Sequence, residues 1–137
     1  MRIVLLVVCL VFLACRPTTR SDGPAEQPQE MRFFVQPAEV GSGETVTLVL
    51  ENRSAAAVGY NLCASSLERL AGEEWQSVPS DRMCTMELRT LPDGEDATYP
   101  MGLPPDLAPG EYRFRTTVER LEAGDRARLE SAPFLVR

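Results

Sequence analysis

The segment LAPGEYRFRTTVE, residues 107–119, decides the fold of this chain. From residue 111 to residue 119 the side chains alternate in character. One face carries Tyr112, Phe114, Thr116 and Val118, and the other carries Glu111, Arg113, Arg115 and Thr117. A period of two residues is that of a β-strand with one buried face. The Pro-Gly pair at 109–110, directly before the strand, predicts a turn.

Shorter segments of the same kind recur on both sides of this strand, separated by Gly, Pro, Asn and Asp. Such punctuation predicts a series of short antiparallel strands. The expected strands are 32–35, 45–51, 57–62, 67–70, 75–78, 86–91, 97–101 and 128–136, the last interrupted at Pro133. Residues 71–74 predict a hairpin turn. A short helix competes with a strand only within residues 63–70.

About eight or nine short strands within residues 31–137 predict an all-β fold, an immunoglobulin-like β-sandwich of about seven to nine antiparallel strands. Four stretches together resemble the bacterial Ig-like domains of cell-envelope proteins and lipoproteins. They are VGSGE at 40–44 before a strand that Asn52 ends, LERL at 67–70 with Trp75, the Leu-x-Pro-Gly-x-Tyr-Arg turn at 107–113, and FLV at 134–136. The resemblance covers nearly all of residues 31–137 and implies a fold, with little about ligand or activity. The tryptophan and the cysteines depart from the antibody pattern.

The turn before the long strand also resembles the tyrosine corner of such sandwiches. In that motif Pro and Gly set the turn, and a buried tyrosine donates its hydroxyl to the chain upstream. The resemblance assigns this role to Tyr112, with an ordinary core tyrosine as the alternative.

The composition excludes several classes of activity. The 137 residues hold 14 basic residues, all of them Arg, against 20 acidic ones, which gives a net charge of −6. Without His the commonest general base and zinc ligand is missing, and without Lys there is no Schiff base or P-loop lysine. An acidic chain also lacks the charge pattern of a nucleic-acid binder. We expect no enzyme, no cofactor and no nucleic-acid partner.

The amino terminus predicts export with a lipid anchor. Residues 1–14 contain Arg2, an uncharged apolar run and Ala14 before Cys15, as in a bacterial lipoprotein signal. The run is too short to span a bilayer. Cys15 is the expected site of acylation, and the lack of Asp after it favours the outer membrane in an organism that has one. Secretion without a lipid is the alternative.

Residues 15–30 follow as the acylated cysteine and its tether. Residues 16–30 hold no large apolar side chain and are rich in Pro, Thr, Gln and Glu. Such a segment buries too little surface to offset its ordering entropy. We expect a spacer between the membrane and a domain at 31–137.

Two cysteines remain for the domain itself, Cys63 and Cys84. In an oxidising compartment two remaining thiols are expected to pair. The alternative is a Cu(I) site, with Met83, Cys84, Met86 and Met101 as soft ligands. Without His we prefer the disulfide and expect no metal. The acidic turn at 93–96 lacks the spacing of a calcium loop.

Three functions follow from these observations. The first is a tethered, non-catalytic interaction module that holds an envelope protein or a glycan. The second is a protease inhibitor on an Ig-like scaffold, with the Pro-rich segment 100–105 as its exposed loop. The third is a copper carrier. Arg113 and Arg115 are interpreted as a salt-bridge ladder with neighbouring acids such as Glu111.

Overall fold

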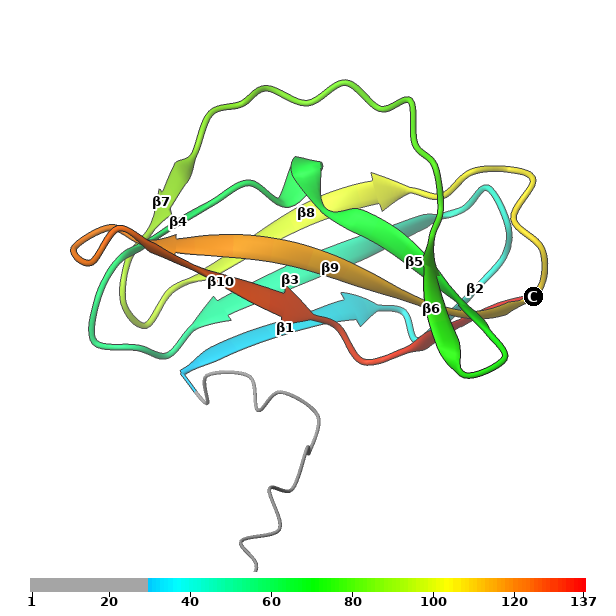
Figure 1. Ribbon diagram of the computed structural model, residues 1–137, viewed down its shortest axis with the longest axis horizontal. Helices are drawn as coiled ribbons and strands as arrows, with labels where there is room; N and C mark the ends of the chain where they lie inside the picture. Colours follow the sequence, from blue (N-terminus) through cyan, green and yellow to red (C-terminus); the bar gives the residue numbers. More distant parts are fainter. Residues whose placement is uncertain (1–29) are drawn as a thin grey trace, which may run out of the picture.

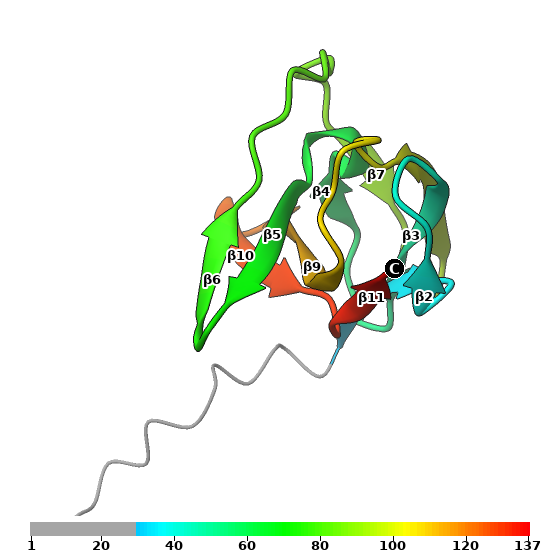
Figure 2. The same cartoon turned by 90° about the vertical axis from the view of Figure 1, so that its right-hand side faces the viewer.

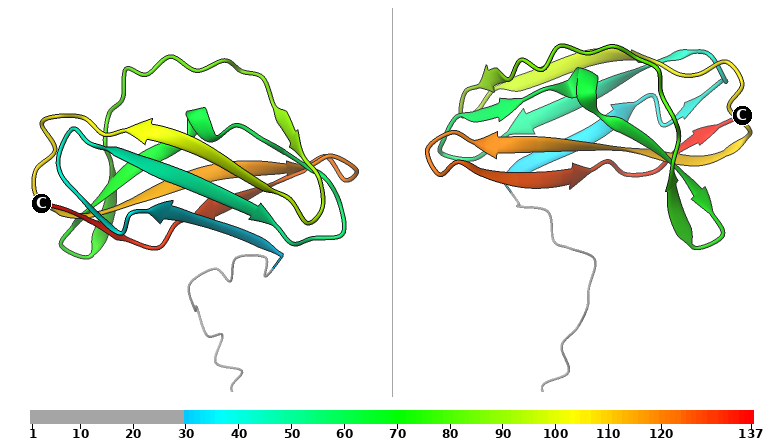
Figure 3. Two further views of the ribbon diagram at one scale, coloured as in Figure 1. Left: turned by 180° about the vertical axis from the view of Figure 1, so that it is seen from behind. Right: turned by 45° about the horizontal axis from the view of Figure 1, so that its top comes forward.

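The structure is a computed structural model that describes residues 30–137. Two β-sheets face each other across one core (Figures 1 and 2). The smaller sheet has the order β1-β3-β8 and is seen from behind in Figure 3. Its strands are β1 (Met31–Gln36), β3 (Thr45–Asn52) and β8 (Asp96–Gly102).

The larger sheet is organised around one long strand, β9 (Gly110–Arg120). One edge of β9 pairs with β10 and then β11, and the other edge pairs with β4 and β5. Outside these lie β2, β6 and β7. The bounds are β2 (Glu39–Val40), β4 (Val58–Tyr60), β5 (Ser66–Ala71), β6 (Glu74–Ser77), β7 (Arg89–Leu91), β10 (Asp125–Glu130) and β11 (Phe134–Val136), with the 3-10 helix η1 (Leu62–Ala64) between β4 and β5.

The core lies between β9 and β3, and the expected alternation of β9 is confirmed. Its four predicted inward side chains, from Tyr112 to Val118, are all buried. Across the core, Leu48 and Leu50 of β3 are fully buried, and the ring of Phe114 stacks on that of Phe134 at 5.8 Å. Burial of each large apolar side chain stabilises the fold by about 1.5–3 kcal/mol. This apolar layer holds the two sheets together.

The structure confirms the β-sandwich and differs from the expectation in its details. It has eleven short strands instead of seven to nine, because segments expected as turns or single strands form additional pairings. Residues 39–40 are not among the strands expected from the sequence, yet β2 pairs in parallel with β11, the one parallel pairing among residues 30–137. The segment 128–136 divides into two strands. At the break, Ser131 exchanges hydrogen bonds of 2.9 and 3.0 Å with the Phe114 backbone.

Two other expectations are corrected. The strand expected at 86–91 is limited to β7, because β4 offers only three residues for pairing. Met86 and Leu88 have the alternating apolar pattern of a strand, but they are 94% and 47% exposed. The helix considered within 63–70 is limited to η1, and β5 takes the rest because it pairs with β9.

Asn52 has a larger role than the strand end that the sequence suggested. Its side chain is fully buried at the end of β3. The amide Nδ2 donates to the carbonyls of Ala56, Leu91 and Pro92 at 2.9–3.1 Å. The amide oxygen accepts from the backbone N–H and the hydroxyl of Ser54. Asn52 therefore joins the end of one sheet to the loops that lead into the other.

Tyr112 makes the contact that defines a tyrosine corner. Its side chain is 1% exposed, and its hydroxyl donates to the Ala108 carbonyl at 2.7 Å. The bond closes the turn that precedes β9. The ring at the same time packs in the core beside Phe134, at a centroid distance of 6.2 Å.

We predict that Tyr112→Phe lowers the free energy of unfolding by about 1 kcal/mol, since it removes the hydrogen bond that the hydroxyl of this buried tyrosine donates to the Ala108 carbonyl. Urea denaturation measures the change. The matched control is Tyr99→Phe, on the partly buried Tyr99 of β8, which we expect to change stability by less than about 0.5 kcal/mol. Equal effects of the two substitutions would argue against the corner.

Candidate functional site

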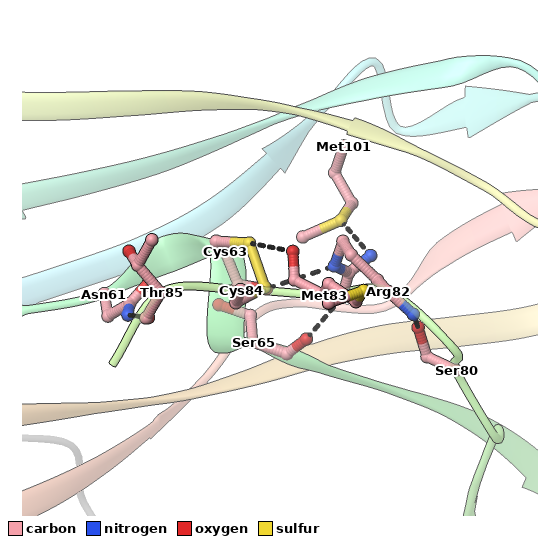
Figure 4. The surroundings of a disulfide bond; sticks show 9 residues. All are labelled: Asn61, Cys63, Ser65, Ser80, Arg82, Met83, Cys84, Thr85 and Met101. Atoms are coloured by element: carbon pink, nitrogen blue, oxygen red, sulfur yellow. Dashed lines mark hydrogen bonds between the residues drawn. A yellow bond between two sulfur atoms is a disulfide. The ribbon is translucent and has the colours of Figure 1, made fainter. Parts of the chain in front are cut away.

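The segment between β6 and β7, residues 78–88, is here called the arch. It crosses one side of the sandwich as a long exposed curve (Figure 1). A disulfide joins Cys84 of the arch to Cys63 of η1, with a Cα–Cα distance of 5.8 Å (Figure 4). The predicted bridge is thereby confirmed, and it ties the middle of the arch to the body of the domain.

The arch follows one long open curve (Figure 1). Residues 78–88 contain no helix, strand, turn or bend. The first anchor is Arg82, which donates from Nε to the Cys63 carbonyl at 3.1 Å and from Nη2 to the Ser65 carbonyl at 3.0 Å (Figure 4). Its third nitrogen lies against the sulfur of Met101. The guanidinium thus fixes the part of the arch before the disulfide.

A second anchor follows the disulfide directly. Asn61, at the end of β4, donates from Nδ2 to the Thr85 carbonyl at 2.6 Å (Figure 4). Together, Arg82, Cys84 and Thr85 give the arch three points of attachment within four residues. Because these attachments come from η1, β8 and the end of β4, the arch has a defined shape although it belongs to neither sheet.

Apolar side chains between and just after the anchors are exposed to solvent. Met83 is 95% exposed and Met86 is 94% exposed, far more than any other large apolar side chain among residues 30–137. Leu88 follows at 47%. Apolar side chains that gather into an exposed patch mark contact surfaces on many proteins.

Hollows flank the arch on both sides. One, of about 260 Å³, lies under it and is lined by the disulfide together with Tyr60, Thr98 and Tyr99. Another, of about 440 Å³, lies over the outer face of β9. Met86 and Leu88 form part of the lining of the second, opposite Arg115 and Arg128.

The outer face of β9 carries a buried charge cluster that the sequence did not reveal. Glu68 of β5 has a side chain only 4% exposed, and it accepts from Arg113 at 2.8 Å and from Arg115 at 2.7 Å. Arg113 also pairs with Glu130 at 2.7 Å and lies 4.4 Å from the centre of the Trp75 ring. The expected salt-bridge ladder exists, but its acids come from neighbouring strands and not from Glu111. Only the register of β5 against β9 reveals these pairs.

Residues 28–130 match the model of a family described as bacterial Ig-like domain. The chain belongs to the bacterial Ig-like domain family. A search of the curated proteins found no match.

Solved structures similar to this Ig-like domain have low sequence identity. A putative ApaA protein from Bordetella pertussis is 18% identical, with a TM-score of 0.48, over 77% of this chain and 87% of the other. The alkylpurine DNA glycosylase AlkC of Pseudomonas fluorescens is 17% identical, TM-score 0.43, over 82% and 31%. The sporulation control protein Spo0M of Bacillus subtilis is 16% identical, TM-score 0.45, over 79% and 49%. The chain thus spans under half the length of the last two, and no property carries over from these similarities.

The segment 100–105, proposed above as an inhibitory loop, is divided between a strand and a loop in this Ig-like domain. Its first three residues belong to β8, which pairs with β3. Met101 is 1% exposed and Leu103 is 5% exposed, so both side chains belong to the core, whereas Pro100 and Pro105 are exposed. An inhibitory role of this segment stays a prediction, with Met101 and Leu103 unavailable as contacts.

The copper alternative loses its thiolate, because the sulfur of Cys84 is bonded to that of Cys63. The sulfur of Met101 contacts the Arg82 guanidinium, a cation that disfavours a metal cation at the same place. Within residues 30–137 no group of three or more Cys, Asp or Glu side chains is arranged to hold a metal ion.

The signal peptide predicted at 1–14, the lipidation site Cys15 and most of the tether to residue 30 lie outside the described residues. In the described part of the chain, no helix has the length and apolar character needed to cross a bilayer.

We predict that the double substitution of Cys63 and Cys84 by Ala lowers the free energy of unfolding by about 3 kcal/mol, from the loop-closure entropy of a bridge spanning 21 positions. Urea denaturation measures the loss. A reducing agent should destabilise the native protein to a similar degree and leave the double variant unchanged. A variant as stable as the oxidised protein would contradict this account.

We also predict that Glu68→Gln lowers the free energy of unfolding by about 2 kcal/mol, because two arginines lose a buried carboxylate partner. The matched control is Glu119→Gln, which breaks the more exposed pair with Arg126 and should cost less than about 1 kcal/mol. Thermal and urea denaturation of both variants test the difference. Similar losses in the two variants would mean that the buried ion pairs of Glu68 stabilise the fold no more than the exposed pair of Glu119.

Proposed function

We propose that this protein is a lipoprotein of the cell envelope, exported and anchored through an acylated Cys15, with the Ig-like domain as a non-catalytic binding module. Its binding surface is the arch. The observation that carries the proposal is the exposure of Met83 and Met86, 95% and 94%, on a backbone fixed by a disulfide.

The physical argument concerns the entropy of binding. A flexible loop loses conformational freedom when it binds, whereas a loop already ordered in its bound shape loses less. The anchors at Arg82, Cys84 and Thr85 supply that order. Two unbranched thioether side chains fit an apolar pocket on another protein better than they fit the hydroxyl-rich surface of a glycan. Between the two partner classes considered, the arch therefore favours an envelope protein.

Several observations support the anchored location. The order of Arg2, apolar run, Ala14 and Cys15 is that of a lipoprotein signal. A structural disulfide suits an oxidising compartment. The start of β1 lies on the side of the sandwich opposite the arch (Figures 1 and 2). A domain tethered through its amino terminus would thus present the arch away from the membrane.

Binding without catalysis is supported by composition. The chain holds neither His nor Lys, and its net charge of −6 opposes contact with nucleic acid. If the organism has two membranes, the residue after Cys15 favours the outer one, since it is Arg and not Asp.

The anchor is tested by Cys15→Ala in the native host. We expect the protein to move from the membrane fraction to the soluble envelope or medium, because a lipidated chain stays bound only through its acyl groups. Labelling with a radioactive fatty acid should mark the native chain and not the variant. Recovery of label in the variant, or no label in either, would contradict the lipoprotein assignment.

The binding surface is tested by a photo-crosslinking amino acid at position 86 of the full chain in its native envelope. We expect one dominant crosslinked protein. The control position is 135 on β11, where Leu135 is 41% exposed and distant from the arch in sequence and structure. Equal products from both positions, or none from position 86, would contradict the arch as the binding surface.

A further inference from the structure

The bond between Met86 and Glu87 occupies a distinctive place on the arch. Met86 comes two residues after the bridged Cys84 and one residue after Thr85, whose carbonyl Asn61 holds at 2.6 Å. Three residues later the chain enters β7 at Arg89. The backbone at 86–87 is therefore held closely on one side and leads into a sheet on the other.

We infer that the arch is a substrate-like inhibitor of a serine protease with an apolar S1 pocket, with Met86 in that pocket and Met86–Glu87 at the catalytic serine. The inference rests on the proposed function, in which the arch is the binding surface. It names the partner class and the residue that the partner recognises.

The backbone shape fits this partner. A protease holds the segment that it cleaves as an extended strand by main-chain hydrogen bonds, and side-chain pockets provide the specificity. Residues 84–88 form no helix, turn or bend and follow the open curve of the arch (Figure 1), a course compatible with such a strand. An ordered loop reaches the protease with little further loss of entropy, which is the general route to tight binding in a standard-size interface.

The side chain at position 86 fits the pocket. Met86 is 94% exposed, unbranched and uncharged, so it can enter a deep apolar slot of the kind that chymotrypsin uses for specificity. Met83 is equally exposed, but the residue after it is Cys84, whose side chain is directed into the body of the domain by the disulfide. The geometry thus favours Met86 over Met83.

The same anchors would slow cleavage. Hydrolysis breaks the Met86–Glu87 amide, places the hydroxyl of one water on the Met86 carbonyl carbon and leaves the remaining proton on the Glu87 nitrogen. The pieces 1–86 and 87–137 would stay together, because β8 pairs with β3, β7 and β9 pair with β4, and β9 pairs with β5. The new amine would remain beside the acyl carbon, so that resynthesis of the bond competes with release.

The test uses the full chain, oxidised and purified in mild detergent, with chymotrypsin and trypsin as probes. We expect inhibition of chymotrypsin and none of trypsin, whose pocket carries an aspartate and selects basic residues. Met86→Asp should weaken inhibition of chymotrypsin by at least about 100-fold, as expected for an anchor residue placed in a desolvated pocket. Met86→Arg should transfer inhibition to trypsin.

The control is Leu135→Asp, an exposed apolar residue on β11, outside the arch. We expect it to change inhibition by less than about threefold, as for a residue outside the contact surface. Circular dichroism verifies that both variants are folded.

Three outcomes would overturn the inference: no inhibition of chymotrypsin by the native chain, rapid cleavage at Met86–Glu87 with loss of inhibition, or an equal loss in the Leu135 and Met86 variants. Crosslinking from position 86 separates this failure from that of the proposed function. A dominant envelope partner without inhibition would support the arch as the binding surface and contradict a protease as its partner. If position 86 crosslinks to no partner and chymotrypsin is not inhibited, both the proposed function and this inference are wrong.

Discussion

Pairing along both edges of β9 is the constraint on which the rest of this Ig-like domain depends. The strand is eleven residues long, and four other strands take their register from it. Its inward side chains form one wall of the core, and its outward arginines hold Glu68. Because β4 and β5 pair with β9, the short connection between them is fixed in place as well. Asn61 and Cys63 belong to that connection, so the positions of these two anchors of the arch depend on the pairing of β4 and β5 with β9.

The arch itself is the part of the domain that the sheets do not account for. Between β6 and β7 the chain leaves the larger sheet and returns eleven residues further on (Figure 1). Its order comes from one covalent bond and a few hydrogen bonds, and two of its apolar side chains, Met83 and Met86, are almost fully exposed. A fold selected only for stability gains little from such an arrangement. The separation of a stable sandwich from a shaped, exposed loop is the usual division between scaffold and contact surface.

The sequence predicts the parts of the structure that depend on local pattern. The alternation at 111–119 locates the central strand and its buried face, and the two remaining cysteines indicate their bridge. The arch was misinterpreted because Met86 and Leu88 alternate with polar residues as in a strand, and nothing local shows that no partner strand is available. Asn52 and Glu68 were missed for a related reason. Each is a buried polar group whose partners are far away in sequence, and those partners are known only once the register is known.

The disulfide makes the shape of the arch depend on whether the compartment that holds the chain is reducing or oxidising. In reducing surroundings Cys63 and Cys84 remain separate thiols, and the arch keeps only the hydrogen bonds from Arg82 and Asn61. The core of the sandwich contains neither of the two cysteines. If the protein is exported as proposed, its arch would take its final shape only on arrival in an oxidising compartment.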